Sequence, residues 1–272
     1  VGLAAAAMVV GQAYMTEISD SLQRIDAKLE SIASMIASDQ KAKVKNALDI
    51  AKTYAALHDD YLQKPAEARQ AARNEIEGRY NDVGQVIDWI TEQLASVEDK
   101  ARDAAEREKD LEPLLKEIKS YEAQFGMCLQ ALSALAMTRM YYDGSMDDRS
   151  ALVEEQRILD KSQGFLKKRQ VLAALMEMKI GGMKGVFIAL PRGTQGNALK
   201  RLVSQTPRAA AKEQVLEAKV KMRASLRSGE SKLRSEAEDR KGEIERIAAA
   251  SRSARTLLTD GTDCWLIDDQ TD

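Results

Sequence analysis

The sequence predicts an all-α protein, an elongated antiparallel coiled coil or helical bundle of about four long helices with one irregular glycine-rich connector. Apolar residues recur at alternating steps of three and four over long stretches, which is the heptad pattern of packed helices. Aromatic residues make up only 4% of the 272 residues, and there are four prolines. This composition is typical of extended helices and not of a sheet protein or a compact enzyme.

Residues 1–15 form an almost wholly apolar opening segment. A bilayer crossing needs about 20 apolar residues, so the segment is predicted to be either the end of a membrane segment or a buried soluble helix. Because the chain does not begin with Met, we expect a longer polypeptide. No basic region precedes the apolar run, so a secretory signal fits poorly. The candidate membrane or partner contacts here are Val1, Leu3, Ala5, Met8 and Val9.

Residues 16–180 are predicted to form the long-helix coiled-coil body. It opens with a heptad ladder made of Ile18, Leu22, Ile25, Leu29, Ile32 and Ile36. The apolar phase changes near Gln40, as in a coiled-coil stutter. No Gly or Pro lies between Thr16 and Lys64. We therefore expect the first helix to continue through the phase change until Pro65 ends it.

The second helix of the body is predicted to begin after Pro65. From Ile76 to Ala136 its apolar positions keep one heptad phase, although Pro113 lies within that stretch. The chain either kinks at Pro113 or reverses around residues 101–110, and the unbroken phase favours a kink. After a turn at residues 143–148, a third helix is expected over about residues 148–180, with an apolar stripe wide enough to contact more than one neighbour.

The remaining chain divides into three predicted segments. Residues 181–206 form the glycine-rich connector, which lacks the spacing of a phosphate-binding loop. Its apolar residues Val186, Phe187 and Ile188 either pack under the end of the bundle or form a tip that contacts a membrane or partner. Residues 207–258 form a charged basic helix, and residues 259–272 an acidic tail whose apolar plug is expected to dock.

Charge is distributed unevenly along the chain. Residues 161–258 contain 22 Lys and Arg against nine Asp and Glu, whereas the whole chain has a net charge of −2. Either the basic helices lie against the acidic ones so that the charges cancel within the fold, or they bind an anionic partner. The candidate contacts with an anionic partner are Lys200, Arg201, Arg208, Lys219, Lys221, Arg223 and Arg227. Nucleic acid is disfavoured because no aromatic residue accompanies this basic stretch for base stacking.

The sequence argues against catalysis. The chain has one His and two distant Cys, with no metal-ligand cluster, nucleophile motif or cofactor motif. We therefore expect no catalytic residue, no metal and no cofactor. The predicted function is a non-enzymatic coiled-coil scaffold or signalling module, free or membrane-tethered, that contacts protein partners or itself in the cytoplasm or at a membrane. The alternatives are a membrane-inserting protein with the architecture of α-helical pore-forming toxins, and a basic rod that binds nucleic acid.

Overall fold

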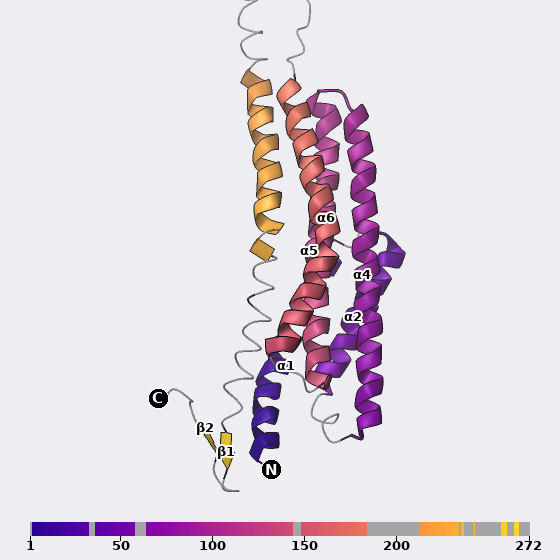
Figure 1. The fold of residues 1–272 in the computed structure, drawn as a ribbon. Helices are drawn as coiled ribbons and strands as arrows, with labels where there is room; N and C mark the ends of the chain where they lie inside the picture. The colour runs from indigo at the N-terminus through magenta and orange to yellow at the C-terminus, as the bar shows by residue number, and fades with distance from the viewer. Residues whose placement is uncertain are drawn as a thin grey trace, which may run out of the picture. The chain divides into compact units, whose positions relative to one another are not determined.

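The computed structural model describes residues 2–32, 36–57, 64–143, 148–183, 213–233, 235–236, 242, 257–259 and 264–266, with the backbone alone for 2–14, 16–17, 148 and the strands. Its elements are α1 (Gly2–Ser31), α2 (Ser38–Ala56), α4 (Ala66–Asp103), α5 (Glu108–Asp143), α6 (Asp148–Gly182), a helix over 213–233, and strands β1 (Leu257–Thr259) and β2 (Cys264–Leu266) (Figure 1). Long helices dominate, which confirms the predicted all-α class.

The chain divides into two compact units. The first unit consists of Val1–Thr91, Glu122–Phe165 and Leu233–Asp272, and the second of Glu92–Tyr121 and Leu166–Lys232. Helices α4, α5 and α6 each contribute residues to both units. Each unit therefore has its own buried apolar core, built from different turns of the same helices.

The predicted opening ladder lies in the core of the first unit. Ile18, Leu22, Ile25 and Leu29 are at most 1% exposed, and Ile32 and Ile36 are also buried. Their spacing places them on one face of α1, which removes that face from water. The ladder is thus the apolar face that attaches α1 to the rest of the unit.

The chain reverses between α1 and α2, so the prediction of one continuous helix through Gln40 is wrong. Lys52 Nζ lies 2.6 Å from Asp26 Oδ2, and Lys41 Nζ lies 3.2 Å from Glu30 Oε2. Contacts between later residues of α2 and earlier residues of α1 require the two helices to be antiparallel. The phase change near Gln40 marks a second helix packed against the first.

The physical signal for this reversal is polar and local. Ser31 Oγ donates a hydrogen bond to the Lys28 carbonyl at the end of α1. Ala37, at φ −59° and ψ 140°, then provides a non-helical residue before α2. Hydroxyl side chains offer the backbone such alternatives to continued helix, so a serine-containing stretch ends a helix without Gly or Pro.

A disulfide provides the test of this antiparallel arrangement. With Asp26→Cys and Lys52→Cys combined, we expect oxidation to produce an intramolecular crosslink, detected by peptide mass spectrometry. In one straight helix the two positions would lie about 39 Å apart, far beyond the reach of a disulfide. Pairing Asp26→Cys with Asp39→Cys, near the start of α2, is the matched control and should not crosslink. A failure of the first pair to crosslink would contradict the reversal.

A second reversal separates α4 from α5, so the predicted kink at Pro113 is wrong. In the first unit Arg73 Nε lies 2.6 Å from Asp143 Oδ1, and Arg139 Nη1 lies 2.8 Å from Glu77 Oε2. These pairs join the start of α4 to the end of α5, as antiparallel helices require. Pro113 lies within α5.

The unbroken heptad phase did not reveal this reversal, because a sequence pattern records which residues are apolar and not the direction of the chain. Residues 104–107 connect α4 to α5, and the heptad spacing continues through them. The two seam positions at this turn are not buried: Ala104 is half-buried, and Glu108, the first residue of α5, is exposed. On both sides the seam is buried, as Ala101 and Leu111 illustrate at 0% exposure.

Helix α6 matches its predicted range and contacts two neighbours in the first unit. Phe165 stacks on Phe125 of α5, with ring centroids 4.0 Å apart and planes inclined by 10°. Arg157 Nη2 lies 2.5 Å from Glu77 Oε1 of α4. These contacts confirm that α6 meets more than one helix, although Leu152 and Leu159 of its predicted apolar stripe are exposed.

The end of the chain forms a short antiparallel pair of strands. Leu258 of β1 pairs with Trp265 of β2, and β1 lies beside α1 in the first unit. The basic helix was expected to extend to residue 258, whereas Leu257 and Leu258 belong to this pair. The predicted connector, residues 181–206, begins later than expected, because Gly181 and Gly182 belong to α6, and residues 184–212 lie outside the described residues. Among the helices that the structure does describe, none combines the length and hydropathy required to cross a membrane.

Candidate functional site

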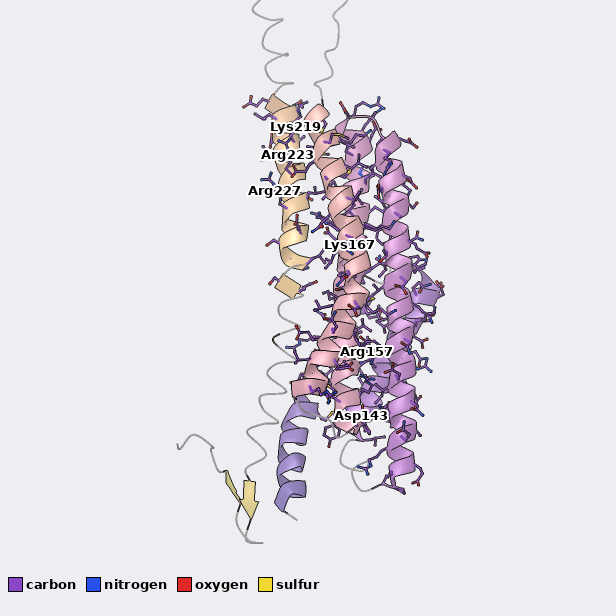
Figure 2. The ribbon with its side chains drawn as sticks, in the orientation of Figure 1. Asp143, Arg157, Lys167, Lys219, Arg223 and Arg227 are labelled. Atoms are coloured by element: carbon purple, nitrogen blue, oxygen red, sulfur yellow. The ribbon has the colours of Figure 1, made fainter. Side chains whose placement is uncertain are left out.

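The structure describes only part of the predicted contact set. Val1, Val186, Phe187, Ile188, Lys200, Arg201 and Arg208 lie outside the described residues. Leu3, Ala5, Met8 and Val9 belong to the first turns of α1, residues 2–14, for which only the backbone is described. Lys219, Lys221, Arg223 and Arg227 lie on the 213–233 helix in the second unit, and Figure 2 labels three of them along that helix.

The 213–233 helix has two apolar faces. Its buried face consists of Ala218, Met222, Leu226 and Leu233, each at most 7% exposed. Leu216 and Val220 belong to the opposite face and are each 62% exposed. One apolar face is sufficient to anchor a surface helix. The second face is therefore not explained by packing within the unit.

This helix lies beside α6 and runs antiparallel to it. Lys219 Nζ donates a hydrogen bond of 2.8 Å to the Gly181 carbonyl, and Arg169 Nη2 donates one of 2.6 Å to the Leu226 carbonyl. Residue numbers rise along one helix as they fall along the other. Arg169 is only 3% exposed, so its hydrogen bond fastens the two helices from inside the unit.

The four described residues of the predicted anionic-partner set differ in what they contact. The ammonium group of Lys219 donates a hydrogen bond to the Gly181 carbonyl, whereas Lys221 is exposed. Arg227 is 72% exposed and lies 3.5 Å from Glu177. An ion pair this exposed contributes little stability, so the Arg227 guanidinium stays accessible to a partner.

Charge within the second unit is unevenly distributed. Residues 92–121 contain nine Asp and Glu against six Lys and Arg, while residues 166–183 and 213–232 together contain nine Lys and Arg against four Asp and Glu. Residues 184–212 add six Lys and Arg and no Asp or Glu, so the unit carries a net positive charge. The described ion pairs include Lys100 with Glu117 and Arg227 with Glu177, and neither joins the acidic residues 92–121 to the basic residues of the later helices.

Sequence reasoning missed a cluster of ion pairs in the first unit. Arg139 of α5 pairs with Glu154 of α6 and with Glu77 of α4, and Arg157 of α6 reaches both carboxylates. Glu154 is 2% exposed. The Arg157 guanidinium also lies 4.5 Å from the ring centroid of buried Tyr80, a cation–π distance. The cluster joins three helices with charge-assisted hydrogen bonds.

The environment shifts the pKa values of this cluster. Burial raises the pKa of Glu77, but the hydrogen bond from Arg157 and the charges of Arg139 and Arg157 lower it by more, so the net pKa falls below its ordinary value. Burial and the charge of Arg157 lower the pKa of Arg139. Burial raises the pKa of Tyr80 to about 12. At neutral pH Glu77 is therefore ionised and Tyr80 is a neutral phenol.

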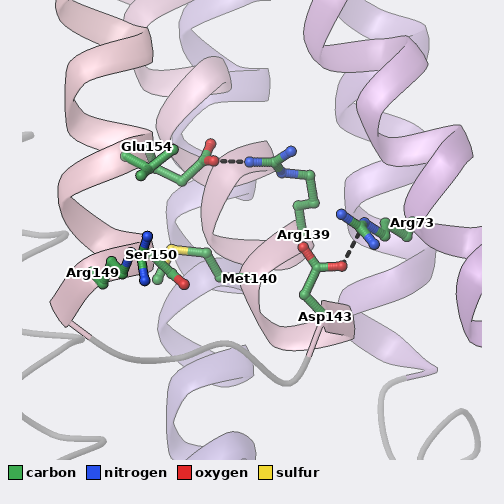
Figure 3. Close-up of a pocket in the computed structure, with 8 residues that line it drawn as sticks. Arg73, Arg139, Met140, Asp143, Arg149, Ser150 and Glu154 are labelled. Atoms are coloured by element: carbon green, nitrogen blue, oxygen red, sulfur yellow. Dashed lines mark ion pairs between the residues drawn. The ribbon is translucent and has the colours of Figure 1, made fainter.

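A pocket of about 480 Å³ adjoins this cluster and is lined by Arg73, Arg139, Met140, Asp143, Arg149, Ser150, Val153 and Glu154. Figure 3 shows that its two carboxylates each face an arginine, Asp143 facing Arg73 and Glu154 facing Arg139. Burial raises the pKa of Asp143 in spite of Arg73. These carboxylates are committed to arginines, and within the described residues no group of His, Cys, Asp and Glu is suited to hold a metal. The cluster joins α4, α5 and α6 through these ion pairs.

One sequence signal pointed to this cluster. Glu154 lies three residues after Ala151 and four before Ile158, on the buried stripe of α6. An acidic residue at a core position requires a buried partner. Arg139 lies in a run of residues that are otherwise apolar or small, and supplies that partner. The pairing itself depends on the reversal at residues 143–148.

We expect the contribution of Glu77 to stability to depend on pH. Its pKa is lower in the folded than in the unfolded chain, so this contribution is complete above the unfolded pKa and is lost as the pH falls through the folded pKa. Glu77→Gln should therefore be less stable than the parent protein at neutral pH, with the difference shrinking in acid. Urea unfolding at a series of pH values measures it. A difference that grows towards acid pH would contradict this assignment.

Cys128 is predicted to be unreactive in the folded protein. It is 0% exposed, and burial raises the pKa of its thiol to about 12. Because the thiolate is the reactive form, we expect iodoacetamide to modify Cys128 only after unfolding. Peptide mass spectrometry of native and urea-unfolded samples provides the comparison. Rapid native modification at neutral pH would show that this part of the core opens readily.

Comparisons with known proteins return no relative for this chain: no family model, no curated protein and no solved structure matches it. Of the two groups of charged residues, the cluster in the first unit is internally paired, and the basic surface of the second unit is accessible.

Proposed function

We propose that this protein is a non-enzymatic helical scaffold or interaction module that acts by binding another protein. The observation that carries the proposal is the location of its exposed large apolar side chains. Seven of the eight described ones lie on α6 or the 213–233 helix: Leu152, Val153, Leu159, Val171, Met178, Leu216 and Val220. The last four of these belong to the second unit, on two helices that contact each other. Exposed apolar side chains on neighbouring helices are typical of a surface that another helix covers.

The charged residues support the same proposal. Catalysis requires convergent polar groups that are available to a substrate. In the cluster of the first unit, Glu77 and Glu154 are held by Arg139 and Arg157, which makes the cluster a fastening between helices. The accessible charges lie instead beside the exposed apolar residues of the second unit, where Lys221 and Arg227 are exposed.

Site-specific photocrosslinking tests this function. A photoreactive amino acid is introduced at Leu216 in the cells that naturally make the protein. It should crosslink to a small, reproducible set of proteins. The same amino acid at Lys116, whose side chain is 75% exposed on α5, is the matched control and should capture none of them. Absence of protein crosslinks at Leu216, or identical crosslinks at both positions, would contradict the proposal.

The two alternative functions are tested with the same protein. Flotation with anionic liposomes that is lost on changing Ala5 and Val9 to Asp would favour a membrane-inserting protein. Salt-dependent binding of duplex DNA that is lost on replacing Lys219, Lys221 and Arg223 would favour nucleic-acid binding. Either result, together with an absence of protein crosslinks, would replace the proposed function.

A further inference from the structure

Two exposed helical faces lie next to each other in the second unit. On the 213–233 helix, Leu216, Val220, Arg223 and Arg227 follow one another at steps of four, three and four. On α6, Val171, Ala174, Met178 and Gly181 follow at steps of three, four and three. Residues at such steps share one face of a helix. Each helix therefore presents a heptad seam outside the core.

Contacts between the helices place these two seams next to each other. A Cβ built on Gly181 would lie 3.6 Å from Arg223 Nη2, so a member of the α6 seam contacts a member of the other seam. Lys219 reaches the same glycine through its carbonyl, and Arg227 reaches Glu177, the residue before Met178. The seams thus line opposite sides of one groove between antiparallel helices.

The apolar side chains of the groove face solvent. Val171 and Met178 are 54% and 63% exposed, and Leu216 and Val220 are each 62% exposed. Ala174 and Gly181 are small and exposed, and leave room for a third helix to approach the groove. A third helix with its own heptad stripe would bury these side chains by the helix-in-groove mode of recognition.

Positive charge is in excess along the two seams. Lys167 lies one turn before Val171 on the α6 seam and is exposed, and Arg223 and Arg227 continue the other seam, which Glu213 precedes (Figure 2). Residues 184–212 carry six Lys and Arg and no Asp or Glu, so their charge does not complement these cations. Complementarity requires negative charges beside the apolar stripe of the occupant.

We infer that this groove is the docking site for an acidic amphipathic helix of a partner protein. The inference rests on the proposed function and specifies its surface and its class of partner. The occupant places its apolar stripe against Met178, Leu216 and Val220, and its flanking carboxylates meet the cations of the groove. Negative charges flanking the stripe, at the positions that border it in a heptad, decide which helix binds.

A designed peptide of about three heptads, with Leu at a and d and Glu at e and g, tests the inference. Fluorescence anisotropy of the labelled peptide should report binding to the whole protein. A peptide with Lys at e and g is its control and should not bind. Leu216→Ser with Val220→Ser should weaken binding roughly tenfold or more, because truncating central apolar contacts removes most of the affinity. Leu152→Ser, at an equally exposed position in the first unit, should leave it unchanged.

Charge reversal provides the second arm of the experiment. Lys167→Glu with Arg227→Glu should weaken binding and make the remaining binding less dependent on salt, since fewer charges are then screened. Lys116→Glu with Lys119→Glu, at two exposed positions of α5, changes the net charge equally and is the control. Equal binding of both peptides, or failure of the groove variants to weaken binding, would overturn the inference.

The remaining outcomes separate the inference from the proposed function. Protein crosslinks at Leu216 without binding of the acidic peptide would overturn the acidic-helix inference and leave the scaffold function standing. Self-association that is lost with Leu216→Ser and Val220→Ser would make a second copy the occupant and overturn the inference. Binding to vesicles of phosphatidylserine that depends on the same residues would assign the groove to lipid, and would overturn it as well.

Discussion

Glu154→Ala is expected to lower the free energy of unfolding by about 1.5–3 kcal/mol, because it removes the buried carboxylate that pairs with Arg139 and leaves Glu77, which is 33% exposed, as the remaining partner of that guanidinium. Glu154 is 2% exposed and Arg139 15% exposed, so water replaces little of the lost interaction. Both tryptophans, Trp89 and Trp265, belong to the first unit, and urea unfolding followed by tryptophan fluorescence therefore reports on the unit that contains the pair.

Two comparisons make this expectation specific. Glu30→Ala removes a carboxylate of the first unit that is 55% exposed and pairs with Lys41, and should change stability by less than about 1 kcal/mol. Combining Glu154→Leu with Arg139→Leu should recover part of the loss, since replacing both charges by apolar groups leaves no buried guanidinium without its nearest carboxylate. A Glu154→Ala variant as stable as the Glu30→Ala variant would show that the pair is not buried as described.

Phe165→Ala should lower the free energy of unfolding by about 3–5 kcal/mol through loss of buried area and formation of a cavity. Phe165 and Phe125 are both 0% exposed and stack face to face in the core of the first unit. Phe165→Leu retains much of the volume and should cost less. The measurement is again urea unfolding followed by tryptophan fluorescence.

Leu152→Ala is the matched control for Phe165→Ala on the same helix. Leu152 is 64% exposed, so we expect its replacement to change stability by no more than about 0.5 kcal/mol. A similar loss from both substitutions would mean that the outer face of α6 is covered in the protein used for the measurement. A negligible loss from Phe165→Ala would contradict the stacked core.

Apolar spacing predicted most of what is buried. The ladder that begins at Ile18 and the seam on either side of residues 104–107 are buried where the heptads placed them. On α6 the prediction holds only in part, because the line through Ile158, Phe165 and Leu172 is buried, whereas Leu152 and Leu159 of the same predicted stripe are exposed. Spacing could not predict the direction of the chain, because a seam on two antiparallel helices and a seam on one kinked helix have the same period. Pro113 does not mark the change of direction, because it lies inside α5, five residues after the helix begins at Glu108.

The candidate surface was only partly predictable. Basic residues at Lys219, Lys221, Arg223 and Arg227 were evident from the sequence, and the exposure of Leu216 and Val220 among them was not. Exposure depends on which face of the helix the neighbouring helices leave open, and that follows from tertiary packing. The ion-pair cluster of the first unit required both the reversal at α5 and α6 and the register of α4.

The α1–α2 hairpin also bears on how the chain folds during synthesis. Its ion pairs join residues 11 and 26 positions apart, and both helices end before Pro65. Contacts between residues close in sequence form quickly because the loop that they close is short. The hairpin can therefore form while α4 is still being synthesised. Its exposed apolar face is then available for the later helices to pack against.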